Sequence, residues 1–147
     1  MSLNYTKIIM AGIAGTIAMT IVGVFGAPMM GLAPMNPATM LAGAMGGMVA
    51  LGWLAHFMIG IVLAFGYVLA APYLPGPGAV RGAIYAIAPW LIAQLVMMPM
   101  MGMPIFSGSV MIAMASLIGH VIYGLVVGAI LGVSTSVPAF RSAHPAV

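Results

Sequence analysis

Four long apolar segments make up most of this sequence, and they restrict the fold more than any other feature. They run from about 7–26, 48–71, 81–98 and 109–133. A helix needs about 20 predominantly apolar residues to cross the hydrocarbon core of a bilayer, and each segment is close to that length. The sequence therefore predicts an all-α integral membrane protein, a four-helix bundle surrounded by lipid.

Charged side chains are almost absent from the chain. Only 2% of its 147 residues are charged, and none is Asp or Glu, whereas a soluble domain has about 25% charged residues. We therefore expect residues 1–147 to form a single membrane domain. Without carboxylates or cysteines the chain has no paired-carboxylate catalysis and no disulfides, and its three scattered cations make no nucleic-acid patch. We expect a non-enzymatic protein.

The longest connection, residues 27–47, has its own helix signals. Asn36 is a good N-cap, Pro37 suits a first helical position, and Gly46-Gly47 is a natural stop. These signals predict one short helix that is too short to span. It should lie at the interface or dip back among the main helices.

The positions of the cations predict the orientation in the membrane. Lys7 precedes the first span, Arg81 lies between the second and third, and Arg141 follows the fourth. With four spans all three fall on one side, and the positive-inside rule makes that side cytoplasmic. We expect a multi-pass protein of the bacterial inner membrane with both termini and the 134–147 tail in the cytoplasm. The short helix then lies on the outer side.

A cleaved signal peptide is the alternative interpretation of the first segment. Its apolar core, within 7–26, is long for such a peptide. No clear Ala-x-Ala cleavage site follows that core, although signal peptidase requires small residues of that kind. The first segment is therefore interpreted as a transmembrane helix.

Two of the predicted helices carry a histidine within a ridge of small residues. Residues four apart lie above one another on a helix, and such ridges mark close contacts between membrane helices. The two histidines should therefore face other helices and not lipid. The ridges are Gly52, His56, Gly60, Ala64 in the second span and Ser116, His120, Gly124, Gly128, Gly132 in the fourth.

His56 and His120 are the candidate functional pair. An ionisable residue inside the membrane suggests a functional site by default. The pair could ligate haem b, with Gly60 and Gly124 giving room for the ring, or a soft metal such as copper(I). The alternative is structural: each ring would bond a carbonyl, hydroxyl or amide across a helix interface, worth about 0.6–2 kcal/mol.

Methionines gather on the predicted outer side of the membrane. Methionine fills irregular gaps in membrane bundles, but its thioether is also a soft ligand that suits copper(I) and needs no carboxylate nearby. Both interpretations remain open at this point. The methionines predicted as possible ligands are Met29, Met30, Met97, Met98, Met100 and Met101.

The two halves of the chain resemble each other. Pro-Met-Met-Gly occurs at 28–31 and at 99–102, and His-x-x-x-Gly-x-Val occurs at 56–62 and at 120–126. Both halves run in the same direction, so a tandem repeat of two helical hairpins would have its pseudo-two-fold axis along the membrane normal. That symmetry would put the two histidines at equal depth.

Several polar residues could line a path between the helices, which makes a small-solute or ion transporter or channel the third functional alternative. Four helices without an acidic relay make a monomeric proton pump a poor fit. The predicted polar lining is Thr16, Thr20, Gln94, Ser116 and Tyr123.

The motifs together resemble a family of small bacterial four-span membrane proteins whose function is unknown. The resemblance covers nearly all of 7–133, and it implies the fold and the membrane location without implying an activity. Asn36 stands where members often carry Asp, which weakens a metal or proton role at that position. The matching motifs are Thr16-x-x-Met19-Thr20, Pro28-Met-Met-Gly31, Met40-Leu41, His56-Phe-x-x-Gly60, Arg81-Gly82, Pro99-x-x-Gly102 and Gly119-His-x-x-Tyr123-Gly124.

The leading functional prediction is therefore a protein that binds a cofactor or metal through His56 and His120, associated with a respiratory or electron-transfer complex. Its main rival is a purely structural accessory or assembly subunit. In either role the chain would pack in a homo-oligomer or a larger membrane complex, since its small-residue ridges serve oligomerisation as well as internal packing.

Overall fold

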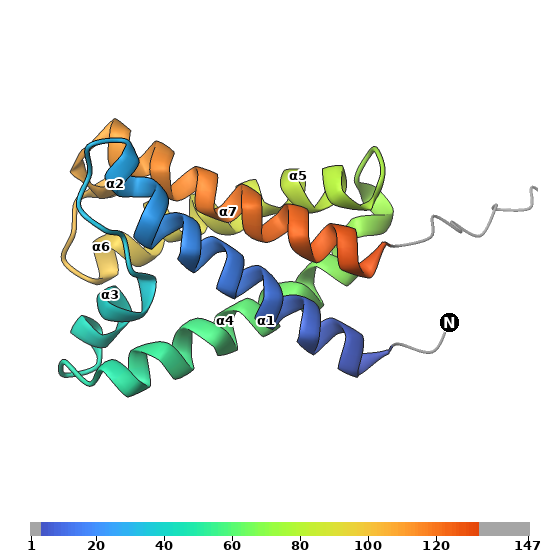
Figure 1. Cartoon of the computed structure of the whole chain (residues 1–147), viewed down its shortest axis with the longest axis horizontal. Helices are drawn as coiled ribbons and strands as arrows, with labels where there is room; N and C mark the ends of the chain where they lie inside the picture. Colours follow the sequence, from blue (N-terminus) through green and yellow to red (C-terminus); the bar gives the residue numbers. More distant parts are fainter. Residues whose placement is uncertain (1–3, 133–147) are drawn as a thin grey trace, which may run out of the picture.

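The structure is a computed structural model that describes residues 4–132, and it confirms the all-α four-helix bundle (Figure 1). Within that range, four helical spans are long and apolar enough to cross a membrane: Tyr5–Met29, Val49–Tyr73, Gly78–Met100 and Val110–Leu131. They are built from α1 (Tyr5–Ile21), η1 (Val22–Gly26), α2 (Ala27–Met29), α4 (Val49–Ala70), η2 (Ala71–Tyr73), α5 (Gly78–Ile92), η3 (Ala93–Met97), α6 (Met98–Met100) and α7 (Val110–Leu131).

The first and third spans run past their predicted ends at 26 and 98 because each contains a π-helical turn, η1 or η3. Each of these turns ends two residues before the proline of a Pro-Met-Met-Gly motif. Proline cannot donate a backbone hydrogen bond, and its ring crowds the carbonyl one turn earlier. A widened turn relieves that conflict without breaking the helix. The predicted tail, 134–147, lies outside the described residues.

The matching π-helical turns support the predicted repeat. In both halves a short helix follows the turn, and a glycine with positive φ then ends the span, +77° at Gly31 and +76° at Gly102. Both positions fall in the left-handed region that glycine adopts without strain. The second helices of the two hairpins, α4 and α7, have the same length of 22 residues.

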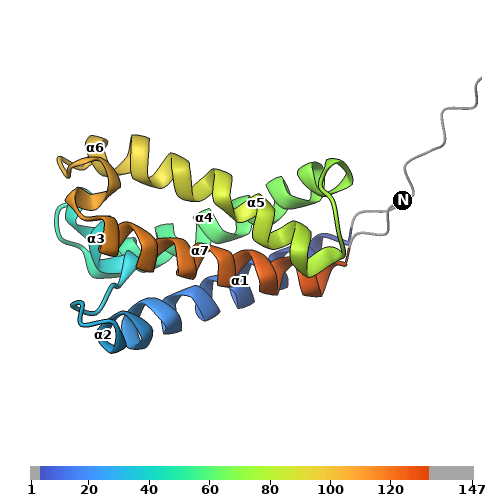
Figure 2. The ribbon, with the colours of Figure 1, turned by 90° about the horizontal axis from the view of Figure 1, so that it is seen from above.

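The close contacts at Gly60 and Gly124 determine which helices pack against each other. A Cβ on Gly60 would meet Thr16 of α1, and a Cβ on Gly124 would meet the backbone of Gly82 in α5. Helix α1 thus packs on α4 and α7, and α5 packs on α7. Figure 2 shows α1 and α5 on opposite sides of α7. The prediction that Gly60 and Gly124 lie at close helix contacts is confirmed.

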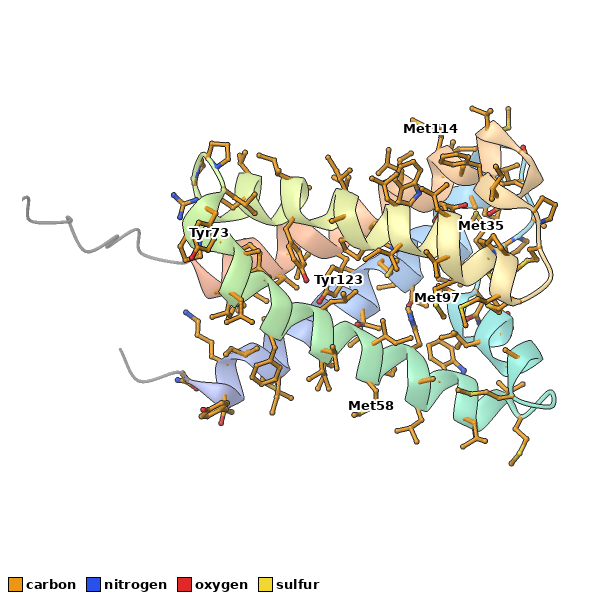
Figure 3. The ribbon with its side chains drawn as sticks, turned by 180° about the vertical axis from the view of Figure 1, so that it is seen from behind. Met35, Met58, Tyr73, Met97, Met114 and Tyr123 are labelled. Carbon is orange, nitrogen blue, oxygen red and sulfur yellow. The ribbon has the colours of Figure 1, made fainter. Side chains whose placement is uncertain are left out.

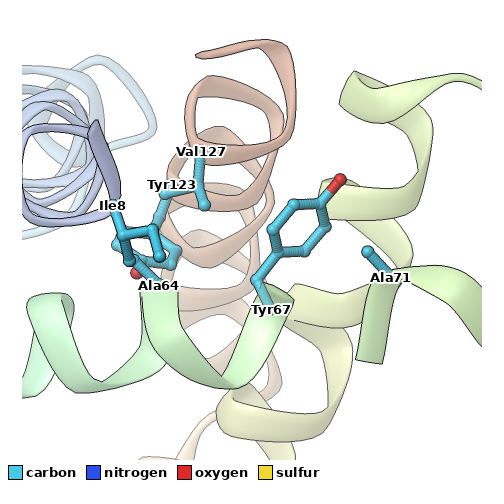
Figure 4. Close-up of a cluster of buried hydrophobic side chains, with 6 residues drawn as sticks. All are labelled: Ile8, Ala64, Tyr67, Ala71, Tyr123 and Val127. Atoms are coloured by element: carbon cyan, nitrogen blue, oxygen red, sulfur yellow. The ribbon is translucent and has the colours of Figure 1, made fainter. Parts of the chain in front are cut away.

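Helices α4 and α5 meet at one end and separate towards the other. Tyr85 donates to the Leu63 carbonyl and Tyr67 to the Gly78 carbonyl, both at 3.0 Å. Tyr67 also belongs to a buried cluster with Ile8, Ala64, Ala71, Tyr123 and Val127 (Figure 4). At the other end of the bundle α4 diverges from α5, and the short helix α3 lies there (Figure 1). This divergence makes room for the cavity described below.

The predicted short helix is α3, which spans Pro37–Ala44. Asn36 caps it by accepting from the Ala38 backbone N–H at 3.0 Å. A Cβ on Gly52 would collide with the Ala38 carbonyl and with Ala42, so α3 packs tightly on α4. The helix therefore folds back against the bundle, as one of the two predicted placements requires.

Reporter fusions test the orientation predicted from Lys7, Arg81 and Arg141. Lys7 and Arg81 lie near the start of α1 and α5, at one end of the bundle (Figure 1). We expect fusions after Pro75 and at the C-terminus to report the cytoplasm, and one within 27–47 to report the opposite side. The reverse pattern would overturn the orientation.

Candidate functional site

The two predicted histidines line one cavity, which has a volume of about 350 Å³. His56 comes from α4 and is 6% exposed, and His120 comes from α7. The cavity is lined by residues of α1, α3, α4, α5, η3 and α7, in the region where α4 and α5 separate. Its volume lies at the lower end of the range of small-molecule sites, about 300–1,000 Å³. Most of its lining residues are apolar.

The hydrogen bonds of His120 assign its tautomer. Nδ1 lies 2.9 Å from the Ser116 carbonyl oxygen. A carbonyl only accepts, so Nδ1 must carry the proton and donate it. Nε2 of the neutral ring then has a lone pair, and none of the described residues donates a hydrogen bond to it. His120 thus has one nitrogen fixed by the protein and one available to a ligand.

His56 reaches the same state through a different partner. Its Nε2 lies 3.0 Å from Thr20 Oγ1, and the Thr20 hydroxyl donates to the Thr16 carbonyl at 2.7 Å. A hydroxyl has one proton, so Thr20 can only accept from the ring, and Nε2 must be the donor. Nδ1 of the neutral ring has a lone pair and receives no hydrogen bond from the described residues. Metal-binding histidines commonly donate their second ring N–H in this way.

Methionine residues line the same cavity as the histidines. Of the six methionines predicted as ligands, Met97, Met98 and Met101 line it. Figure 3 shows Met97 and Tyr123 in the space between α4 and α5, whereas Met58 and Met114 lie on outer faces. The cavity also includes three methionines that were not predicted as ligands, and these are Met19, Met35 and Met40.

The predicted polar residues form a network behind His120. Gln94 is 1% exposed; it donates to Ser116 Oγ at 3.2 Å and accepts from Ser107 Oγ at 3.0 Å. Ser107 lies in the short helix η4 (Ile105–Gly108), where it has a φ of +56°. That strained backbone holds its hydroxyl against Gln94. Nothing in the sequence around Ser107 distinguishes it from other loop serines, so it was not predicted.

The other predicted site residues divide between the cavity and its surroundings. Thr16 and Tyr123 line it, and Tyr123 donates across the bundle to the Gly60 carbonyl at 2.6 Å. Gly60 also lines the cavity. The residues that lie outside the lining are Thr20, which bonds His56, Gly124, which packs on α5, and the exposed Met29, Met30 and Met100.

The lining fits a soft metal ion better than haem. Haem b brings two propionates, and no Lys or Arg of the described chain lines the cavity. Gly124 cannot make room for a ring, because the backbone of Gly82 already occupies the space beside it. Across residues 4–132 no group of three His, Cys, Asp or Glu could hold a metal. A metal at this place would therefore need methionine ligands besides the two imidazoles.

Comparison with known protein families places the chain in one of them. Residues 4–142 match a family of unknown function, DUF6789, so the chain belongs to that family. Comparisons with curated proteins and with solved structures gave no significant match. The family covers the entire bundle and agrees with the resemblance seen in the sequence, and it assigns no activity.

Proposed function

We propose that this member of the DUF6789 family binds copper(I) inside the membrane, through His56 and His120 and with thioethers of Met97, Met98 and Met101. The proposal is supported mainly by the hydrogen bonding of the two imidazole rings. Each ring donates one N–H to a protein oxygen and keeps one lone pair, and both histidines line a cavity that methionine residues also line.

The ligand chemistry favours copper(I) over other metals. Mg²⁺ and Ca²⁺ prefer carboxylate and carbonyl oxygens, and zinc is usually held by cysteine, histidine or carboxylate. The chain has no cysteine and no carboxylate side chain. Imidazole and thioether are neutral, and soft sulfur ligands select Cu(I). A monovalent ion with such ligands leaves a single positive charge to be stabilised in an apolar cavity.

Binding of a small apolar molecule from the bilayer is a second candidate. Ile59 on α4 and Ile92 on α5 line the cavity and are also 42% and 56% exposed. The cavity therefore opens between these helices towards the lipid. A membrane-dissolved molecule with one polar group could enter there and bond to His120. Mass spectrometry of purified protein without added metal would reveal such a molecule.

Membership of a respiratory complex and residence in the bacterial inner membrane stay predictions from the sequence. A copper-binding bundle could serve beside a copper-containing respiratory enzyme, whereas a structural subunit would need no ligand. Purification with and without added copper separates the two roles, since only the first predicts that bound metal accompanies the chain.

Two methionine variants, one inside the cavity and one outside it, test whether the cavity binds the metal. Met97 lines the cavity, and Met58 on α4 is 51% exposed on an outer face. We expect purified protein to bind one equivalent of Cu(I), and Met97→Leu to weaken binding by roughly tenfold through the loss of one soft ligand. Met58→Leu should bind as the unaltered protein does. Competition with a Cu(I)-specific chelator measures both affinities.

X-ray absorption gives an independent reading of the same site. Copper bound by this cavity should show both nitrogen and sulfur neighbours, because the lining offers imidazoles and thioethers. If the protein binds no more Cu(I) than empty detergent micelles do, the proposal is refuted. An equal loss of affinity in Met58→Leu would show that the metal binds elsewhere.

A further inference from the structure

A second cavity lies beside the first, at the end of the bundle that carries α3 and η4. It is an open hollow with a volume of about 260 Å³, lined by the loop before α3, by α3 itself, and by the segment that leads into α7 together with the first turn of α7. Met103 lies on its wall, together with Met35 and Met40. Three methionine residues thus line a second space beside the cavity that holds the histidines, and only Met103 is absent from the lining of the first cavity.

The two cavities share part of their walls. Met35, Met40 and Ser107 line both of them. The backbone N–H of Met35 donates to the Gly23 carbonyl at 2.9 Å, which fastens this loop to the π-helical turn of the first span. Met40 stands on the first turn of α3, whose N-cap is Asn36. Both methionines are thus held by ordered backbone at the boundary between the cavities.

The methionines lie at increasing distance from the loop end of the bundle. Figure 3 places Met35 closer than Met97 to the loop end of the bundle. Met103 lines only the outer cavity, and Met97 lines only the inner one. A series of thioethers therefore extends from the loops to the histidines without a carboxylate that would hold a hard cation in place of Cu(I).

The polar groups of the outer cavity are largely engaged by the protein. Asn36 Oδ1 accepts from the Ala38 N–H, and Thr39 donates to the Asn36 carbonyl at 2.8 Å. Ser107 donates to Gln94. The methionine sulfurs accept no hydrogen bond from the described residues, and they remain as ligands for a soft cation.

The opening between α4 and α5 does not suit an ion. Its rim, Ile59 and Ile92, is apolar, and a charge crossing hydrocarbon is costly. A cation must therefore reach His56 and His120 from the loop end. Movement through a series of weak sites requires binding strong enough to attract the ion and weak enough to release it.

We propose that Met103, Met35 and Met40 form an access route by which Cu(I) passes from the loop end to the His56–His120 cavity. This inference rests on the proposed function. At each step a thioether of the next methionine forms a Cu–S bond as the bond to the previous one breaks. Copper stays Cu(I) throughout, so no electron or proton is transferred.

Loading kinetics separate the route from the binding site. Cu(I) is supplied to the detergent-solubilised full chain from a Cu(I)–chelator complex, and the rate of loading is followed by stopped-flow absorbance. We expect Met103→Leu to slow loading by roughly tenfold while changing the equilibrium affinity less than about threefold, because Met103 lines the outer cavity and not the one that holds the histidines. Met114→Leu is the matched control, because Met114 is 46% exposed on α7 and lines neither cavity.

The possible outcomes distinguish the two proposals. An unchanged loading rate in Met103→Leu, with normal Cu(I) affinity, would refute the route and leave the binding site standing. Absence of Cu(I) binding in the unaltered chain would refute both. Equal slowing in Met114→Leu would also count against the route. Met103 is half-buried in a loop outside the helices, so Met103→Leu should fold as the unaltered chain does.

Discussion

Gly124→Ala should destabilise the bundle, whereas Gly119→Ala on the same helix should not. A Cβ on Gly124 would lie 2.6 Å from the Gly82 carbonyl carbon and 2.7 Å from Ala86 Cβ, well inside normal contact distances. The obstacle is helix backbone, so α5 and α7 must move apart. We expect a loss of about 1–3 kcal/mol in the free energy of unfolding, typical of an overfilled contact.

Gly119 offers a matched comparison because only the surroundings differ. A Cβ there would meet Met19 at 3.7 Å, which is ordinary contact. Alanine is favoured over glycine within a helix by about 1 kcal/mol, so Gly119→Ala should be neutral or stabilising. Unfolding by denaturant in mixed micelles measures both variants.

A larger side chain at Gly124 sharpens the same test. Gly124→Leu should prevent recovery of folded protein, because leucine is far larger than the space left beside Gly82. Leu125→Ile, at the neighbouring half-buried position, keeps the volume and should be tolerated. Equal and mild effects at Gly124 and Gly119 would contradict the close packing of α5 on α7.

The spans and the glycine contacts could be predicted from the sequence because both depend on local pattern. A run of apolar residues must cross the bilayer as helix, since the backbone has no other hydrogen-bond partners there. The spacing of Gly52, His56 and Gly60 turned this face of α4 inward, and each of the three is buried.

That His56 and His120 would share one site followed from their paired ridges, but the shape and the walls of their cavity could not be predicted, because these arise from how the helices diverge. The predicted repeat makes the interface between α4 and α5 equivalent to the interface between α1 and α7. In the structure, however, α1 packs on α7, whereas α4 and α5 separate. No short motif encodes that difference. Met35 and Met40 join the lining only because α3 folds back onto α4. Met100, by contrast, follows the same sequence pattern as its neighbours but is 75% exposed.

Removing either cavity histidine should abolish most of the copper(I) binding. His56 and His120 come from different helices, and each keeps one lone pair while the other ring nitrogen is held by Thr20 or Ser116. Loss of a partner that merely orients a ligand costs about 10–100-fold in metal affinity. Loss of the ligand itself should cost at least about 100-fold.

The double variant distinguishes one shared site from two separate ones. If both rings hold one ion, His56→Ala combined with His120→Ala should lower affinity little further than either change alone, since groups that act as a unit are not additive. Two independent sites would instead give two equivalents of Cu(I) in the unaltered chain and one in each single variant. His144→Ala, in the C-terminal segment outside the described residues, controls for the loss of a histidine as such. Full binding by the double variant, with the bundle still folded, would assign both imidazoles to structural hydrogen bonding and favour the accessory-subunit role.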